Sequence, residues 1–135
     1  SVVNNIRQID QGESVSYGST WVAKRRSMIA VVPIGYADGM HRLLSNRSVA
    51  LFAQKKVPIV GRICMDFLML DVTDVVSGSE VDKWIEEEIV LFGFDDKNNF
   101  LSAEELSVNA NTIVWETLTS ISERVPRRFR GTKKI

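Results

Sequence analysis

The stretch FLMLDV, residues 67 to 72, decides the fold class of this chain because its side chains alternate between two faces. In an extended chain every second residue points the same way, so Phe67 and Asp71 share one face while Leu68 and Val72 share the other. The two faces therefore meet different surroundings. This pattern predicts a β strand that borders a core.

Segments of the same kind recur from residue 1 to residue 72. They are rich in Val and Ile and are broken by Gly, Pro or Asn about every ten residues, as in small β domains. The expected strands cover residues 2–9, 19–24, 27–33, 47–52, 56–61 and 67–72. This succession predicts a mainly β fold, a small closed Greek-key-like β barrel, with one or two short helices near the C-terminus.

The second half of the chain has a weaker pattern. Residues 76–88 are mostly polar and are interpreted as a surface excursion before a strand at 89–92. Ser102, followed three residues later by Glu105, is typical of a capping box and predicts a short helix through residue 106. Asn111 is a candidate cap for a second helix over residues 112–122.

Composition excludes several classes of partner. Seventeen basic residues balance seventeen acidic ones, so no net charge favours nucleic acid or an anionic membrane. Apolar runs are far shorter than the roughly 20 residues of a membrane-spanning helix. A lone Cys64 fits a reducing compartment, and with a lone His41 it cannot form a zinc site. We therefore expect a cytoplasmic protein without a metal.

Four short motifs stand out together: SYG at 16–18, IGYADG at 34–39, GRICMD at 61–66 and RVPR at 124–127. In this order and spacing they resemble the C-terminal β domain of alanine racemase, a pyridoxal-phosphate enzyme that makes D-alanine for bacterial peptidoglycan. The resemblance covers residues 1–130, and we expect residues 131–135 to be a frayed tail.

The resemblance implies a two-domain enzyme of which this chain is one domain. In that family an N-terminal β/α barrel carries pyridoxal phosphate on a lysine, and the β domain of one subunit closes the active site of the other in a homodimer. The barrel and its lysine are absent from this chain. The chain alone is therefore expected neither to bind the cofactor nor to racemise alanine.

The tyrosine of the SYG motif, Tyr17, is implied to be catalytic. Racemisation removes the Cα proton from one face and returns a proton to the other, so it needs two bases. By resemblance the barrel lysine serves the D face and Tyr17 serves the L face. A phenol needs nearby positive charge or hydrogen-bond donors to act as a base near neutral pH, and the family draws this help from the partner barrel.

Three further residues match positions along the substrate corridor of the family. Tyr36 in IGYADG resembles a tyrosine that lines the outer corridor, and Arg42 and Arg62 match two arginines of the same corridor. Without the motif, both arginines would be interpreted as solvated or paired surface residues. As corridor residues they would attract a carboxylate substrate.

The resemblance also implies residues deeper in the substrate corridor. Backbone N–H groups near Met65 would hold the substrate carboxylate, and Asp66 and Ile113 match inner-corridor positions. Trp115 stands where the family has a tyrosine whose hydroxyl bonds the cofactor phosphate; an indole N–H donates but cannot accept. Phe67 also departs from the usual Gln or Met.

These departures leave alternatives open. The chain could belong to a serine or broader-specificity racemase, or the differences at Trp115 and Phe67 could be substitutions without functional effect. A related β domain of decarboxylases built on the same two-domain plan is a second enzymatic alternative, against which the SYG and IGYADG pair argues. A free-standing β-barrel binding module without catalysis is the third.

The basic residues 124–134 are interpreted as a solvated face or an interdomain contact. A nucleic-acid site is not expected there, because the segment lacks the aromatic side chains on which bases stack.

Overall fold

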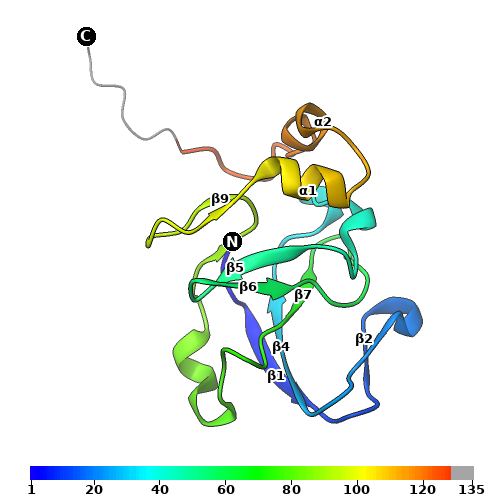
Figure 1. The fold of residues 1–135 in the computed structure, drawn as a ribbon, viewed down its shortest axis with the longest axis vertical. Coiled ribbons are helices and arrows are strands. Elements are labelled where there is room, and N and C mark those ends of the chain that lie inside the picture. The colour runs from blue at the N-terminus through cyan, green and yellow to red at the C-terminus, as the bar shows by residue number, and fades with distance from the viewer. Residues whose placement is uncertain (129–135) are drawn as a thin grey trace.

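Two antiparallel three-stranded sheets form the centre of the computed structural model, which describes residues 1–128 (Figure 1). The expected tail at 131–135 lies outside the described residues. The first sheet has the order β1-β4-β7 and the second β6-β5-β8. Their strands are β1 (Asn5–Ile9), β4 (Ser27–Val32), β5 (Val49–Phe52), β6 (Lys55–Pro58), β7 (Leu68–Asp71) and β8 (Ile89–Val90).

Two short hairpins extend from these sheets. In the first, β2 (Ser14–Val15) pairs with β3 (Trp21–Val22), and in the second, β9 (Gly93–Phe94) pairs with β10 (Phe100–Leu101). Single bridges at Val2–Glu88 and Ile59–Leu70 join the edges of the large sheets. The predicted mainly β class with a few short helices is confirmed. Closure into a Greek-key barrel is not confirmed, because no sheet within residues 1–128 closes on itself.

The alternation in residues 67–72 has the predicted structural result. Leu68, Leu70 and Val72 are fully buried, whereas Met69 and Asp71 on the other face are only half-buried. β7 pairs with β4 so that Leu70 lies opposite Ala30, which is also fully buried. This face joins the larger hydrophobic core, together with the inner faces of β5 and β6.

The helices are short. Four are 3-10 helices: η1 (Tyr17–Ser19), η2 (Tyr36–Asp38), η3 (Arg42–Leu44) and η4 (Gly78–Trp84). The α-helices are α1 (Ala103–Asn109) and α2 (Val114–Thr119), which lie side by side at one end of the molecule (Figure 1). None of the helices in residues 1–128 combines the length and apolar character needed to cross a membrane.

The predicted cap of α1 is confirmed in part. The Glu105 N–H donates to Ser102 Oγ at 3.0 Å, but the Glu105 carboxylate bonds Lys56 instead of completing the capping box. The predicted cap of α2 is wrong: Ile113 is its N-cap and makes no side-chain cap. Asn111 lies before it at φ 55, in a left-handed turn that an asparagine tolerates.

Residues 76–88 are more than the predicted surface excursion. Val76 is buried, and η4 carries Trp84 against the edge of Phe52, with ring centroids 5.2 Å apart. Trp84 and Ile85 therefore cover the core next to β5. Large apolar residues spaced irregularly in a 3-10 helix give no periodic signal, so their packing is not visible in the sequence.

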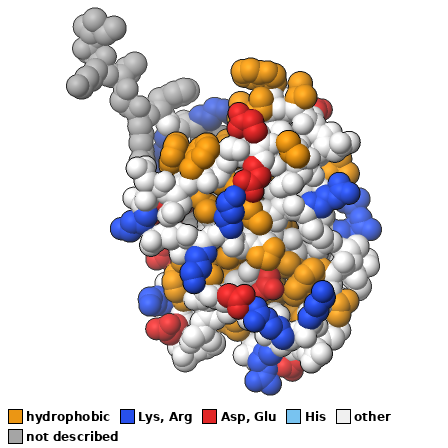
Figure 2. Space-filling view, in the orientation of Figure 1, with side chains coloured by type: hydrophobic (Ala, Val, Ile, Leu, Met, Phe, Trp, Pro, Cys, Tyr) orange, Lys and Arg blue, Asp and Glu red, His pale blue; other side chains and the backbone are white. Residues whose placement is uncertain are grey.

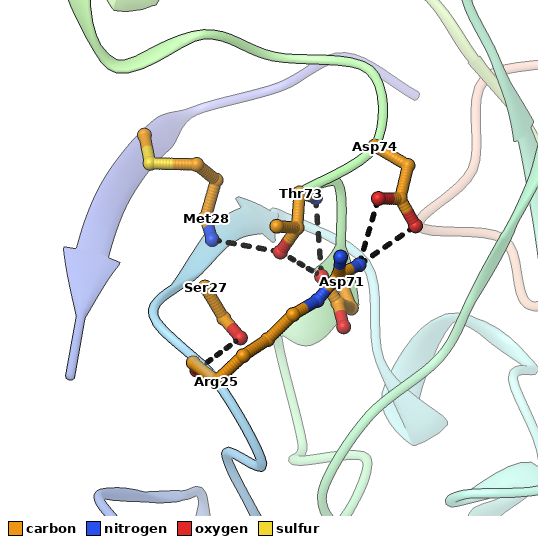
Figure 3. A network of polar contacts seen from close by, with 6 residues as sticks. All are labelled: Arg25, Ser27, Met28, Asp71, Thr73 and Asp74. Carbon is orange, nitrogen blue, oxygen red and sulfur yellow. Dashed lines mark hydrogen bonds and ion pairs between the residues drawn. The ribbon is translucent and has the colours of Figure 1, made fainter. Parts of the chain in front are cut away.

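A polar network fixes the end of β7 against the start of β4 (Figure 3). The Met28 N–H donates to Thr73 Oγ1 at 3.0 Å, and both the N–H and the hydroxyl of Thr73 donate to Asp71 Oδ1. Beside it, Arg25 Nη2 lies 2.7 Å from both Asp74 oxygens, and this hydrogen bond raises the pKa of Arg25. The network holds the turn that follows the strand.

Candidate functional site

Tyr17 is the first residue of η1, in the turn between β2, which was not predicted, and β3. Its side chain is 73% exposed, and the hairpin that carries it projects away from the two large sheets (Figure 1). No side-chain hydrogen bond to Tyr17 is recorded within residues 1–128. The phenol is therefore accessible to a molecule or domain outside this chain, rather than sealed in the core.

A hollow of about 340 Å³, called the access hollow below, opens beside Tyr17. It brings together five of the eight predicted site residues, which come from four separate stretches of the chain. Tyr36 begins η2, Arg42 begins η3, and the other wall is the loop before β7. The predicted residues in this hollow are Tyr17, Tyr36, Arg42, Met65 and Asp66.

A second hollow, of about 540 Å³, meets the first at Tyr17. It runs along the outer face of the β1-β4-β7 sheet, where Ile29 and Met69 form its floor, and Arg7 is its charged residue. Cys64 and Tyr17 line both hollows. This second hollow was not predicted, because the residues that form it are spread from Arg7 to Met69 and no single motif contains them.

The motifs IGYADG and GRICMD meet through their backbones. The N–H groups of Tyr36 and Ala37 donate to the carbonyls of Cys64 and Met65, both at 3.0 Å. An added Cβ on Gly35 would lie 2.2 Å from the Cys64 carbonyl oxygen, so this close approach requires glycine. The contact places Tyr36 and Met65 on neighbouring walls of the access hollow.

Arg124 ties the fourth motif to these two. Its Nη2 donates to Asp66 Oδ1 at 2.7 Å, and its Nε lies 3.3 Å from Oδ1 of the buried Asp38. The other Asp38 oxygen accepts the N–H of Gly35 at 2.8 Å. The hydrogen bond with Asp66, followed by the charge of Asp38, raises the pKa of Arg124. The interpretation of this residue as part of a solvated face or interdomain contact misses this role.

Arg62 lies behind Tyr17 instead of in the access hollow. A Cβ built on Gly18 would be 3.3 Å from Arg62 Nε, so the guanidinium lies against the η1 turn. The Arg62 carbonyl accepts a hydrogen bond from Ser16 Oγ at 2.7 Å. The sequence shows no cation next to Tyr17, and the structure places one there from a stretch 45 residues away.

Cys64 lies where the two hollows meet. It is half-buried, and its Sγ lies 3.5 Å from Ser16 Oγ. It therefore contacts the turn that carries Tyr17 and forms part of the wall between the two hollows.

Ile113 and Trp115 are not brought to either hollow. They are 64% and 70% exposed, at the start of α2. This helical end lies well away from the hairpin of Tyr17 (Figure 1), and exposed hydrophobic side chains gather there (Figure 2). A single chain therefore does not present Trp115 and Tyr17 to the same hollow.

Comparisons with known proteins agree on one family. The family model described as "Alanine racemase, C-terminal domain" matches residues 1–129. The alanine racemase of Sorangium cellulosum is 46% identical over 128 residues, which cover 93% of this chain and 32% of that protein.

Solved structures give the same result. The alanine racemase from Streptomyces coelicolor superposes with a TM-score of 0.87 at 31% identity, covering 98% of this chain and 33% of that one. The alanine racemase from Bartonella henselae with covalently bound pyridoxal phosphate has a TM-score of 0.78 at 36% identity, covering 92% and 32%. This chain spans about a third of the length of each relative.

Proposed function

This chain belongs to the family of alanine racemase C-terminal domains, and on that premise we propose that it is part of an enzyme that interconverts L- and D-alanine. The observation that carries the proposal is the exposed Tyr17 side chain, which lines a hollow together with Tyr36, Arg42 and Met65. The two sheets, joined by single bridges, would act as one barrel-like domain over residues 1–130.

The chain fits one wall of a pyridoxal-phosphate site. Among the described residues no lysine lines either hollow, so the covalent anchor for the cofactor would come from the missing N-terminal domain. Bound there, pyridoxal phosphate supplies an electron sink that makes the substrate Cα proton removable. Trp115 offers only an N–H donor at a distant, exposed position, which makes it a poor substitute for a hydroxyl that anchors phosphate.

Tyr17 would act as the base on the L face. Its ionised oxygen accepts the Cα proton of L-alanine, and its O–H returns a proton to Cα in the reverse direction. A base outside this chain acts on the opposite face. The Arg62 guanidinium lies against Gly18, directly after the residue proposed as the base.

The substrate carboxylate would be held by the loop before β7. Within residues 1–128 no acceptor is recorded for the Met65 N–H, which leaves it available to a ligand. Arg42 adds a positive charge to the same hollow, and the negative charge of Asp66 is balanced by its ion pair with Arg124. The net effect of these residues favours a small anionic substrate.

A second subunit would complete the site. Tyr17 has few contacts in its own chain and projects from a hairpin, so a neighbouring barrel domain must supply the facing wall. We propose a homodimer in which each chain serves the other subunit's site, in the cytoplasm, and no racemase activity for this chain alone. Alanine is the proposed substrate; a preference for serine is the alternative, since Phe67, which departs from the family pattern, lines both hollows.

The experiment compares the full-length protein with its Tyr17→Phe variant by exchange of the Cα hydrogen in D₂O. With L-alanine the variant is expected to lose at least about 100-fold in exchange rate, the usual size of an acid–base contribution. With D-alanine the loss should be much smaller. Tyr36→Phe, which removes the other tyrosine hydroxyl of the hollow, is measured for comparison and should not distinguish L-alanine from D-alanine. Wild-type rates on both faces in Tyr17→Phe would disprove the role of Tyr17.

A further inference from the structure

Ser16, directly before Tyr17, has a backbone conformation that only glycine adopts readily. Its φ is 67° and its ψ is −178°, a region in which the Cβ of other residues is crowded. Such strain persists only where surrounding contacts impose it, and it gathers at functional sites. Ser16 is half-buried, and its strained backbone leads into the residue proposed as the base.

The contacts that impose this conformation come from one short segment, residues 61–64. Ser16 Oγ donates to the Arg62 carbonyl at 2.7 Å and lies 3.5 Å from Cys64 Sγ. Gly61 comes so close that an added Cβ would lie 2.9 Å from Ser16 Cβ and 2.7 Å from the Val15 carbonyl oxygen. The chain on both sides of Ser16 is thus pressed against the GRICMD segment.

We propose that Ser16 is a positioning residue: its hydroxyl, by donating to the Arg62 carbonyl, holds the strained backbone that directs the Tyr17 phenol into the access hollow. The inference rests on the proposed role of Tyr17. If φ of Ser16 returned to a negative value, the hydroxyl would leave Arg62 and the Tyr17 side chain would turn with the backbone. A rotation about φ of Ser16 would therefore break the hydrogen bond and redirect the phenol at the same time.

Ser19 supplies a matched control in the same turn. It also has a positive φ, 47°, but in the left-handed region, and its hydroxyl donates to Ser14 Oγ at 3.0 Å on the exposed side of the hairpin. No hydrogen bond from its side chain to residues 61–64 is recorded. Ser19→Ala removes a hydroxyl from η1 without touching the contact with Arg62.

The test uses the full-length protein and three variants: Ser16→Ala, Ser16→Gly and Ser19→Ala. Cα hydrogen exchange is measured separately with L-alanine and D-alanine, together with KM for each and the melting temperature. We expect both Ser16 variants to lose roughly 10- to 100-fold in exchange with L-alanine, the size of effect that misplacement of a reacting group produces. Exchange with D-alanine and KM should change less than threefold.

Ser16→Gly separates positioning from folding. Glycine adopts the conformation without strain, so the melting temperature should stay equal or rise while exchange with L-alanine falls. If Ser16 had only a structural role, its variants would lose exchange with L-alanine and with D-alanine in parallel with a lower melting temperature, and this result would overturn the inference. Ser16 variants that exchange L-alanine as fast as Ser19→Ala would also overturn it.

Tyr17→Phe, measured beside them, distinguishes the two proposals. If Tyr17→Phe abolishes exchange with L-alanine while the Ser16 variants remain normal, only the positioning role is wrong. If Tyr17→Phe exchanges L-alanine normally, the role of Tyr17 is wrong, and the positioning role is wrong with it.

Discussion

Replacing Gly35 with alanine tests the contact that places Tyr36 beside Met65. Gly35 has φ −148° and ψ −159°, an extended conformation that alanine adopts freely, so the backbone itself adds no strain. The added Cβ, however, would lie 2.2 Å from the Cys64 carbonyl oxygen and 2.4 Å from that of Met65. Both are backbone atoms, which cannot move aside as a flexible side chain does.

The expected loss of stability follows from this geometry. Ordinary contact begins at 3.4 Å, so the two segments must separate by about 1.2 Å. This separation breaks the hydrogen bonds from Tyr36 and Ala37, both 3.0 Å long. Two hydrogen bonds at about 1 kcal/mol each and a local overpacking of about 1–3 kcal/mol give a loss of about 3–5 kcal/mol in the free energy of unfolding.

Urea unfolding of the chain, followed by tryptophan fluorescence, measures this loss. Two control variants separate the possible causes. Gly78→Ala meets only an ordinary contact at 3.6 Å, and should change stability by less than about 0.5 kcal/mol. Gly12→Ala has open space but φ +90°, and should lose about 1–2 kcal/mol from strain alone. A Gly35→Ala variant as stable as Gly78→Ala would refute the close approach.

Three further predictions concern the core and the turns. Phe52→Ala should lose about 3–5 kcal/mol in urea unfolding, because Phe52 is 1% exposed and its ring packs on Trp84. Ser102→Ala should lose about 1 kcal/mol in the same assay, since the hydroxyl accepts the Glu105 N–H at 3.0 Å. The control is Ser79→Ala, which removes an exposed hydroxyl that lies 2.9 Å from Ser77 Oγ; a loss for Ser102→Ala no larger than that of the control would contradict the cap. Burial raises the pKa of Asp95, but three hydrogen bonds within its own turn outweigh it and hold the pKa below its ordinary 3.8. A lowered pKa gives stability above about pH 4 that is lost as the pH falls through the lowered value. The amide-exchange protection factors of this hairpin, corrected for the intrinsic exchange rate at each pH, should therefore fall in acid, and Asp95→Asn should remove that pH dependence.

Period-two patterns and capping signals predict much of the fold. The strands near residues 27–33 and 67–72 are found nearly in full, because each buries one continuous face. The β9–β10 hairpin was missed because each strand has two residues, too few for a period. Its turn was not predicted either, although an aspartate at 95 followed by Asn98 and Asn99 is typical of a tight turn.

The candidate site was predictable only where a motif carries the residue. Tyr17, Tyr36 and Met65 were predicted because SYG, IGYADG and GRICMD resemble a known family; the structure brings them to one hollow, and their roles stay predictions. The ion pairs of Arg124 and the hydrogen bond of Ser16 were not found, since each joins residues more than 40 positions apart. Contacts of that kind depend on how the strands pair, which local patterns do not determine.

Two of the walls of the access hollow are built alike. Tyr36 and Arg42 each open a three-residue 3-10 helix, and the third residue of each helix, Asp38 or Leu44, is buried. The first position lines the hollow while the third anchors the turn. Directed evolution of substrate range can therefore randomise the opening residues and keep the anchors fixed, and most members of such a library should still fold.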